Sequence, residues 1–379
     1  MKQYETNNLR NICICGSGTT GKTQLTEAML FLAKAIERLG NTDSGNTVCD
    51  FSPDEIERNI SIRSAVVFCE WKDKKINIID TPGYADFIGE MTGGLSVADT
   101  AVLNICAFEG VGINTEKIWE HIQEKTKPTL IFVNRMDKEN ANFDNVLSTA
   151  KEKLSPNIAP ITIPVGAAED FKGIVNLITN KAIIDGKESE IPEELKSAAE
   201  TYRDSLIEAI ASSDDSLTEK YLDGKELTPD EIKGSIKRGM IAGKLIPLMV
   251  GSALNSIGVS ELLDFTVDYL PSPLEFDSIA KVEPEGNFTG LVFKTSMESH
   301  MGAINYLKII SGSISGGTDV YNITRRGTER IGAVAFPLGK NRVEAGSANA
   351  GDIVALVKLK STGTNFNLIA FPGICGNYF

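Results

Sequence analysis

The stretch NICICGSGTTGKT, residues 11–23, decides the fold of this chain. Its apolar first half is typical of a buried strand, and residues 16–23 match the pattern G-x-x-x-x-G-K-S/T. Between a strand and a helix, this pattern predicts a phosphate-binding loop. Glycines let backbone N–H groups approach the phosphates, and the helix N-terminus attracts their charge. By itself the loop leaves ATP and GTP undecided.

We interpret every residue of this loop as a nucleotide contact: Gly16, Ser17, Gly18, Thr19, Thr20, Gly21, Lys22 and Thr23. Lys22 is expected to reach the β- and γ-phosphates and to act in catalysis, and the Thr23 hydroxyl is expected to bind Mg²⁺. Apolar side chains then recur at helical spacing over residues 23–39, which predicts a helix that Gly40 ends.

Apolar runs and helical patterns alternate along the next part of the chain. Residues 100–108 and 128–136 are continuous apolar runs, the pattern of strands buried on both faces, and a helix is predicted between them over 114–125. Strands that alternate with helices predict an α/β fold with a mostly parallel, doubly wound sheet. We place this domain at residues 1–272.

The character of the sequence changes after Pro273. Residues 273–285 read as an acidic, proline-bearing linker, and from Gly286 on short alternating strands are separated by glycine turns. This pattern predicts an antiparallel β-barrel over residues 286–379.

Three further motifs follow predicted strands. In DTPG, Asp80 is expected near the Mg²⁺ ion and the Gly83 N–H near the γ-phosphate. NRMD suits guanine, because Asp137 can accept hydrogen bonds from N1–H and the 2-amino group, which adenine lacks in that arrangement. GSAL offers backbone N–H groups to the guanine O6. The predicted contacts are Asp80, Thr81, Pro82, Gly83, Tyr84, Asn134, Arg135, Met136, Asp137, Ser252, Ala253 and Leu254. Together the four motifs favour GTP or GDP as the ligand.

The charge and composition of the chain exclude several kinds of binding partner. The formal net charge is −13, and residues 185–231 carry fifteen acidic and five basic side chains, so we expect no DNA binding. The acidic stretch is either the solvated face of helices or a docking surface for a basic partner. No apolar run approaches the roughly 18 residues of a membrane span, so no membrane partner is expected. Two histidines argue against a histidine-based metal site, and six scattered cysteines fit a reducing cytoplasm.

These motifs, in this order, resemble translational GTPases and specifically the elongation factor G family. Residues 51–71 are similar to the first switch region of that family, and residues 171–183 to the start of an insertion in its GTP-binding domain. Residues 247–273 are similar to the end of that domain, and AGDI at 350–353 to a turn of its second-domain barrel. The resemblance extends to about Lys360.

The resemblance implies a cytoplasmic, monomeric GTPase that uses GTP/GDP and Mg²⁺ and acts on the ribosome, at the ribosomal RNA factor-binding site and the stalk protein. It implies an inserted α+β subdomain at about 158–245, whose acidic part would meet the stalk protein. Ser61 takes the position of the switch threonine that completes Mg²⁺ coordination. The family continues with three further domains. Residues 361–379 no longer follow the family pattern, so a barrel truncated at its end is expected.

Tyr84 stands where family members usually have the catalytic histidine, and GYADF at 83–87 resembles a divergent elongation-factor-G-like branch. Gly18, Thr19, Asn59 and Ser61 also depart from the family pattern. Imidazole gains a proton near neutral pH, whereas a phenol has a pKa of about 10 and cannot become a cation. We therefore expect normal GTP binding and slow hydrolysis, unless Tyr84 only packs against the switch. Two alternatives stay open: a GTP-bound ribosome-binding module with little catalysis, and a ribosomal-protection or release-factor relative.

Overall fold

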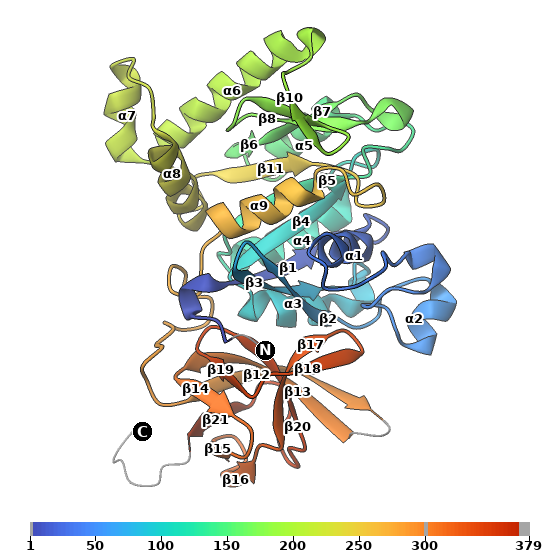
Figure 1. Cartoon of the computed structure of the whole chain (residues 1–379), viewed down its shortest axis with the longest axis vertical. Coiled ribbons are helices and arrows are strands. Elements are labelled where there is room, and N and C mark those ends of the chain that lie inside the picture. The colour runs from blue at the N-terminus through green and yellow to red at the C-terminus, as the bar shows by residue number, and fades with distance from the viewer. Residues whose placement is uncertain (1–2, 299–301, 371–379) are drawn as a thin grey trace.

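The computed structural model describes residues 3–298 and 302–370. A layered α/β region forms one end of the molecule, and a region of strands forms the other (Figure 1). The last predicted barrel residues, 371–379, lie outside the described part of the chain. Within the described residues, no helix is long and apolar enough to cross a membrane.

The central sheet of the α/β region has the strand order β2-β3-β1-β4-β5-β11-β6. Its strands are β1 (Leu9–Cys15), β2 (Ala65–Trp71), β3 (Lys74–Asp80), β4 (Thr100–Cys106), β5 (Thr129–Asn134), β6 (Ile158–Pro160) and β11 (Ile246–Val250). Neighbouring strands run parallel, except that β2 is antiparallel to β3. The predicted mostly parallel, doubly wound sheet is confirmed.

Helices cover both faces of this sheet: α1 (Lys22–Leu32), α3 (Ile88–Val97), α4 (Ile113–Glu124), α5 (Phe143–Lys153) and α9 (Val259–Tyr269). The predicted helix over 23–39 is wrong in its second half, because α1 ends at Leu32. Lys34 adopts a left-handed backbone with φ 58°, and the Ala35 N–H bonds the Leu30 carbonyl at 2.9 Å, which closes the helix end. The apolar spacing continued past Leu32 because the following turn still packs against the core.

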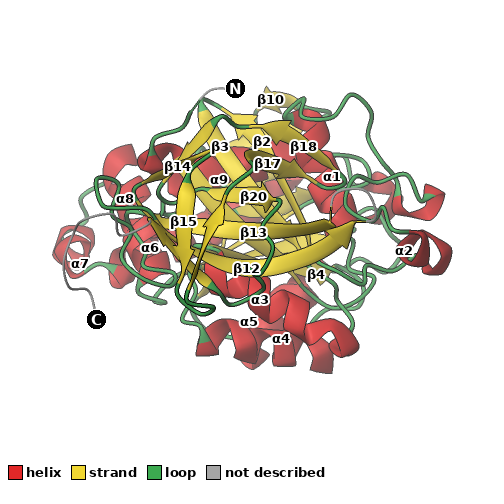
Figure 2. Cartoon of the chain, turned by 90° about the horizontal axis from the view of Figure 1, so that it is seen from below, coloured by secondary structure: helices red, strands yellow, loops and turns green. Residues whose placement is uncertain are grey.

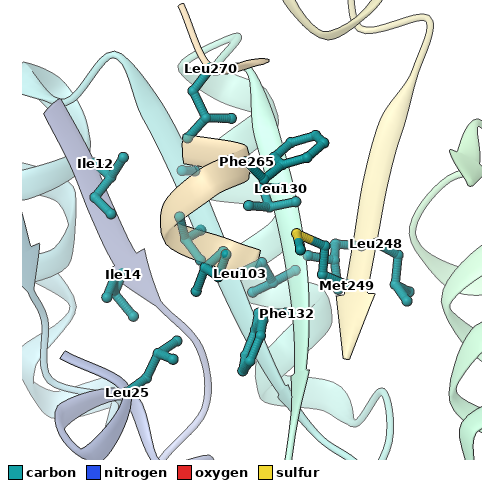
Figure 3. Close-up of a cluster of buried hydrophobic side chains, with 14 of the residues drawn as sticks. Ile12, Ile14, Leu25, Leu103, Leu130, Phe132, Leu248, Met249, Phe265 and Leu270 are labelled. Carbon is teal, nitrogen blue, oxygen red and sulfur yellow. The ribbon is translucent and has the colours of Figure 1, made fainter. Parts of the chain in front are cut away.

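The core lies between the sheet and its helices, as Figure 3 shows for one cluster. The labelled side chains are 0–3% exposed and come from β1, α1, β4, β5, β11 and the α9 region: Ile12, Ile14, Leu25, Leu103, Leu130, Phe132, Leu248, Met249, Phe265 and Leu270. Strands buried on both faces explain why the sequence showed continuous apolar runs rather than alternation.

Between β6 and β11 the chain builds a small α+β unit, as the fold class predicted. Its antiparallel sheet has the order β10-β9-β8-β7. The elements are β7 (Thr162–Val165), β8 (Gly173–Asn176), β9 (Lys181–Ile184), β10 (Lys187–Ser189), α6 (Glu193–Ser213), α7 (Asp215–Leu222) and α8 (Pro229–Ile241). Leu206 and Ile210 are buried on the apolar side of α6, and the acidic side chains of this helix are exposed to solvent.

The second region is an antiparallel sheet of order β16-β15-β21-β12-β13-β20-β17-β18, with β14 paired to β19 beside it. Its strands are β12 (Thr289–Glu298), β13 (Gly302–Ser311), β14 (Ser313–Ser315), β15 (Asp319–Asn322), β16 (Gly327–Arg330), β17 (Ala333–Leu338), β18 (Asn341–Glu344), β19 (Ser347–Asn349), β20 (Ile353–Val357) and β21 (Asn367–Ala370). Figure 2 shows β12, β13 and β20 side by side. The predicted antiparallel β domain is confirmed.

Ion pairs join the two regions. They are Lys75–Asp352, Lys308–Asp99 and Lys294–Glu90. The side chains of the first two pairs are 0–2% exposed, so they are buried between the sheet of the α/β region and strands β13 and β20. Buried charges persist only when they are paired, so these contacts fix how the two regions meet.

Candidate nucleotide-binding site

The predicted nucleotide residues follow the carboxyl ends of β1, β3, β5 and β11. These strands are neighbours or near neighbours in one parallel sheet, so the loops that leave them meet at a single edge. In open α/β sheets, ligands bind in the crevice at this edge.

The loop of residues 16–23 is shaped by close contacts that exclude larger side chains. Gly16 presses against the Asn104 carbonyl, with no room for a Cβ atom. Gly21 has φ 83°, and a Cβ there would lie 2.8 Å from Asn134 Nδ2. Thr19 also adopts a left-handed backbone, with φ 64°. These conformations turn the loop so that α1 begins at Lys22, with its N-terminus toward the crevice.

Lys22 is buried inside this loop. Its Nζ donates a hydrogen bond to the Ser17 carbonyl at 2.8 Å. Burial lowers the pKa of Lys22, and the nearby Asp80 carboxylate acts in the opposite direction. A cation held within a loop of backbone N–H groups is suited to bind phosphate oxygens.

A cluster of oxygen atoms lies beside Lys22. Thr23 Oγ1 donates to Asp80 Oδ2 at 2.7 Å and lies 3.2 Å from Ser61 Oγ. Ser61 Oγ in turn donates to Asp50 Oδ2 at 3.1 Å. Burial, followed by the charge of Asp50, raises the pKa of Asp80 to about 7. Asp50 is a residue that sequence reasoning missed, because it belongs to no motif.

This cluster fits a hard divalent cation. Asp80 Oδ1 is buried and has no hydrogen-bond partner in the described part of the chain. Hydroxyl and carboxylate oxygens are the ligands that Mg²⁺ uses, and a cation would also relieve the unfavourable proximity of the two carboxylates. Hydrogen bonds connect the three residues expected at the metal, Thr23, Ser61 and Asp80. Asp50 belongs to the same cluster through its hydrogen bond with Ser61.

The residues expected at the base form a second group. Asn134 Nδ2 donates to the carbonyls of Thr20 at 3.0 Å and Gly21 at 3.3 Å, while its Oδ1 accepts from the Ala253 N–H at 2.9 Å. Asn134 thus ties the phosphate loop to the loop after β11. A second asparagine, Asn104, also donates to the Thr20 carbonyl, at 2.9 Å, and no sequence motif pointed to it.

The other residues expected to contact the guanine base differ in how far they are exposed. Met136 and Ser252 are buried, and each is fixed by backbone bonds, to the Gly251 carbonyl and to Ile257 respectively. Asp137 is 11% exposed and has Lys138 Nζ 3.5 Å from its carboxylate. Leu254 is 42% exposed, so it lies at the surface rather than in the core.

The loop after β3 lies directly on the phosphate loop. Gly83 packs against Lys22 and the Gly18 backbone so closely that a Cβ would collide with both. Tyr84 is 41% exposed, and its ring covers Gly18, where an added Cβ would come within 3.1 Å of the ring. Thr81 anchors the loop, because its Oγ1 donates to the Ile14 carbonyl at 2.7 Å. The residue in the predicted catalytic position therefore contacts the loop expected to hold the phosphates.

Comparison with known proteins finds two matching families and a similar crystal structure. Residues 7–272 match the family described as elongation factor Tu GTP binding domain, and residues 287–369 match elongation factor G domain 2. A protein from Thermus thermophilus, known from a crystal structure, is similar over 96% of this chain with a TM-score of 0.88 and 28% sequence identity. This chain covers 54% of that protein's length.

Proposed function

Since the chain belongs to the elongation factor Tu GTP-binding domain family and is a translational GTPase of the elongation factor G type, we propose that it binds GTP and Mg²⁺ and acts on the ribosome. The observation that supports this best is the convergence of Lys22, the Thr23–Asp80 pair and Asn134 at one edge of the sheet.

In this proposal, residues 16–23 surround the phosphates, and Asp137 reads the guanine edge with the backbone of residues 252–254 beside it. Thr23, Ser61 and Asp80 would hold the Mg²⁺ ion, with Asp50 near them, and the ion would neutralise charge on the phosphate oxygens. Lys22 binds the same oxygens as a fixed cation. Asp80 Oδ1, which has no hydrogen-bond partner among the residues that the structure describes, supports this arrangement.

We further propose that hydrolysis is slow because Tyr84 takes the position of the family's histidine. A phenol can donate one hydrogen bond to water or phosphate, but it cannot supply positive charge near neutral pH. The close contact of its ring with Gly18 supports a role beside the phosphates rather than in solvent. GTP would then persist on the protein after binding.

Single-turnover GTP cleavage with and without ribosomes tests this proposal. We expect wild type to cleave slowly in both, and Tyr84→His to raise the ribosome-stimulated rate by about tenfold or more, since a positioned acid–base group contributes at least that much. Tyr84→Phe separates the hydroxyl from the ring. Rapid cleavage by wild type that Tyr84→Phe does not slow would exclude both slow hydrolysis and a role for the hydroxyl.

A second candidate is a ribosome-binding module that acts by occupancy, with GTP as a structural ligand. The same Tyr84 contact favours it, and multiple-turnover measurements separate the two. Negligible turnover with ribosomes, despite tight binding to them, would favour occupancy.

The acidic insertion is proposed to meet the ribosomal stalk protein. Along α6 the side chains of Glu193, Glu194, Glu200, Asp204 and Glu208 are exposed. A basic partner would be attracted to this face, and salt would weaken the attraction. Charge reversal at Glu200 and Asp204 should slow association with the stalk protein, whereas reversal at the exposed Asp319 should not. Equal rates for all variants would leave α6 as a solvated face only.

A further inference from the structure

Helix α1 carries a buried carboxylate one turn after the phosphate-loop Thr23. Glu27 is 0% exposed, and its Oε1 accepts a hydrogen bond from the Val48 N–H at 2.6 Å. Its Oε2 faces Gly40 so closely that a Cβ at position 40 would collide with it. Burial raises the pKa of Glu27, and the backbone N–H groups of Val48, Gly40 and Cys49 act in the opposite direction. A carboxyl group buried in this way needs a specific reason, because desolvation is costly.

The neighbouring side chain on α1 holds the same piece of chain. Gln24 Nε2 donates to the Gly40 carbonyl at 3.0 Å. Glu27 and Gln24 together fix residues 40 and 48, the two ends of a loop that contains the short 3₁₀ turn Thr42–Ser44. The helix that begins in the phosphate loop therefore also sets the path of the 40–50 segment.

This segment ends at the oxygen cluster described above. Two residues after Val48, Asp50 Oδ2 accepts from Ser61 Oγ at 3.1 Å, and Ser61 Oγ lies 3.2 Å from Thr23 Oγ1. The hydrogen bond from the Val48 N–H to Glu27 therefore holds the backbone only two residues before Asp50, which contacts the expected metal ligand Ser61. A shift of the Val48 backbone would move Asp50 away from Ser61.

The second region supports the same segment from outside. In the turn between β17 and β18, Gly339 packs on the Val48 carbonyl, with no room for a Cβ atom. The Gly339 N–H also donates to the Val66 carbonyl at 3.1 Å. Val48 is therefore held between Glu27 on α1 and Gly339 of the β domain.

We propose that Glu27 is a positioning residue, which fixes the 40–50 segment so that Asp50 and Ser61 lie beside Thr23 and Asp80, with the Gly339 turn as a second support. The presence of a cation beside these residues rests on the proposed function, whereas the position of the 40–50 segment depends only on contacts within this chain. Glu27 contacts neither substrate nor metal, so its effect passes through the backbone of residues 40–50.

Hydrogen exchange on the intact chain tests the segment directly. In wild type without nucleotide, the Val48 amide should exchange much more slowly than an unstructured amide. Glu27→Gln replaces a charged acceptor by a neutral amide oxygen, and it should speed exchange at Val48 by about tenfold, because a hydrogen bond to a neutral acceptor is weaker than one to a charged acceptor. Glu37→Gln makes the same chemical change at an exposed glutamate just beyond α1 and serves as the matched control.

Trypsin provides a second readout, because Arg58 is exposed in the short helix α2 (Pro53–Arg58), which follows the segment. With Mg²⁺ and a non-hydrolysable GTP analogue, Glu27→Gln should be cut at Arg58 about tenfold faster than Glu37→Gln. Its affinity for GDP should stay within about threefold, because the phosphate loop is unchanged. Equal exchange and equal cleavage in the two variants would overturn the proposal.

Three further outcomes are decisive. If Glu27→Gln does not fold, Gly339→Ala pushes on Val48 from the other side, and normal protection of Val48 in that variant would overturn the support by the β domain. An unprotected Val48 amide in wild type would overturn the role of Glu27 without any variant. If wild type binds no guanine nucleotide, the proposed function fails, while exchange in the nucleotide-free protein still decides the role of Glu27.

Discussion

Replacing Asp352 by Asn would leave Lys75 buried without its counter-charge. Lys75 Nζ lies 2.8 and 3.0 Å from the two carboxylate oxygens, and the two side chains are 0% and 2% exposed. Burial lowers the pKa of Lys75 to about 8, although Asp352 acts to raise it. In the Asp352→Asn variant this pKa should fall further, because the carboxylate that raises it is gone, so a larger fraction of Lys75 would be neutral near neutral pH.

The expected loss in the free energy of unfolding follows from the difference between the wild-type pKa of Lys75 and the pH. In wild type at pH 7, the charged form of Lys75 is favoured over the neutral form by about one pH unit, because its pKa is about 8. The variant loses up to this much stabilisation, so we expect a loss of up to about 1 kcal/mol at pH 7. At pH 5 the interval between the wild-type pKa and the pH widens to about three units, so the loss can grow to at most about 4 kcal/mol. The loss vanishes above pH 8, because it shrinks as pH rises through the folded pKa.

Urea unfolding of both proteins at pH 5, 7 and 9, followed by tryptophan fluorescence and by circular dichroism, measures this loss. Asp319→Asn, at an exposed carboxylate of β15, is the matched control and should change stability by less than about 0.5 kcal/mol. A loss in Asp352→Asn that is independent of pH would refute the reasoning. A loss that grows with pH would refute it too, because high pH removes the proton from a buried lysine and so removes the unpaired charge.

Three other predictions concern guanine recognition by Asp137, the link that Asn134 makes between two loops, and the left-handed turn at the end of α1. Asp137→Asn should shift preference from guanine to xanthine nucleotides in competition binding, and unchanged guanine selectivity would exclude the assigned role of Asp137. Asn134→Ala should weaken GDP binding by about tenfold, because it removes the link between the phosphate loop and the loop after β11 and leaves the buried Ala253 N–H without its acceptor; a smaller effect in calorimetric titration would show that this link is unimportant. Lys34→Gly should raise the free energy of unfolding by up to about 1 kcal/mol, because glycine adopts the left-handed conformation without strain, whereas Lys34→Ala should not raise it.

The sequence was sufficient for features encoded by neighbouring residues. Continuous apolar runs predicted the parallel strands, and the loop at residues 16–23 predicted its own place at the start of α1. The same local reasoning misplaced the end of α1, because the left-handed turn at Lys34 keeps apolar side chains against the core and so preserves helical spacing. Apolar spacing alone does not distinguish a helix from a helix followed by a packed turn.

Contacts between distant parts of the chain were not predictable in this way. Asp50, Asn104 and Glu27 belong to no motif, and their roles arise from partners that only the fold brings near. The Lys75–Asp352 pair joins residues 277 positions apart. A lysine and an aspartate are ordinary surface residues in a sequence, and nothing local marks them as buried.

The contact between Tyr84 and Gly18 links substitutions at the two positions. A Cβ at position 18 would come within 3.1 Å of the Tyr84 ring, so any larger residue there competes with the ring for space. A bulky side chain at position 18 would therefore displace the half-exposed Tyr84 ring, whereas a smaller residue at position 84 would leave room for it. The two positions are coupled through this contact, so a substitution at one should change the effect of a substitution at the other.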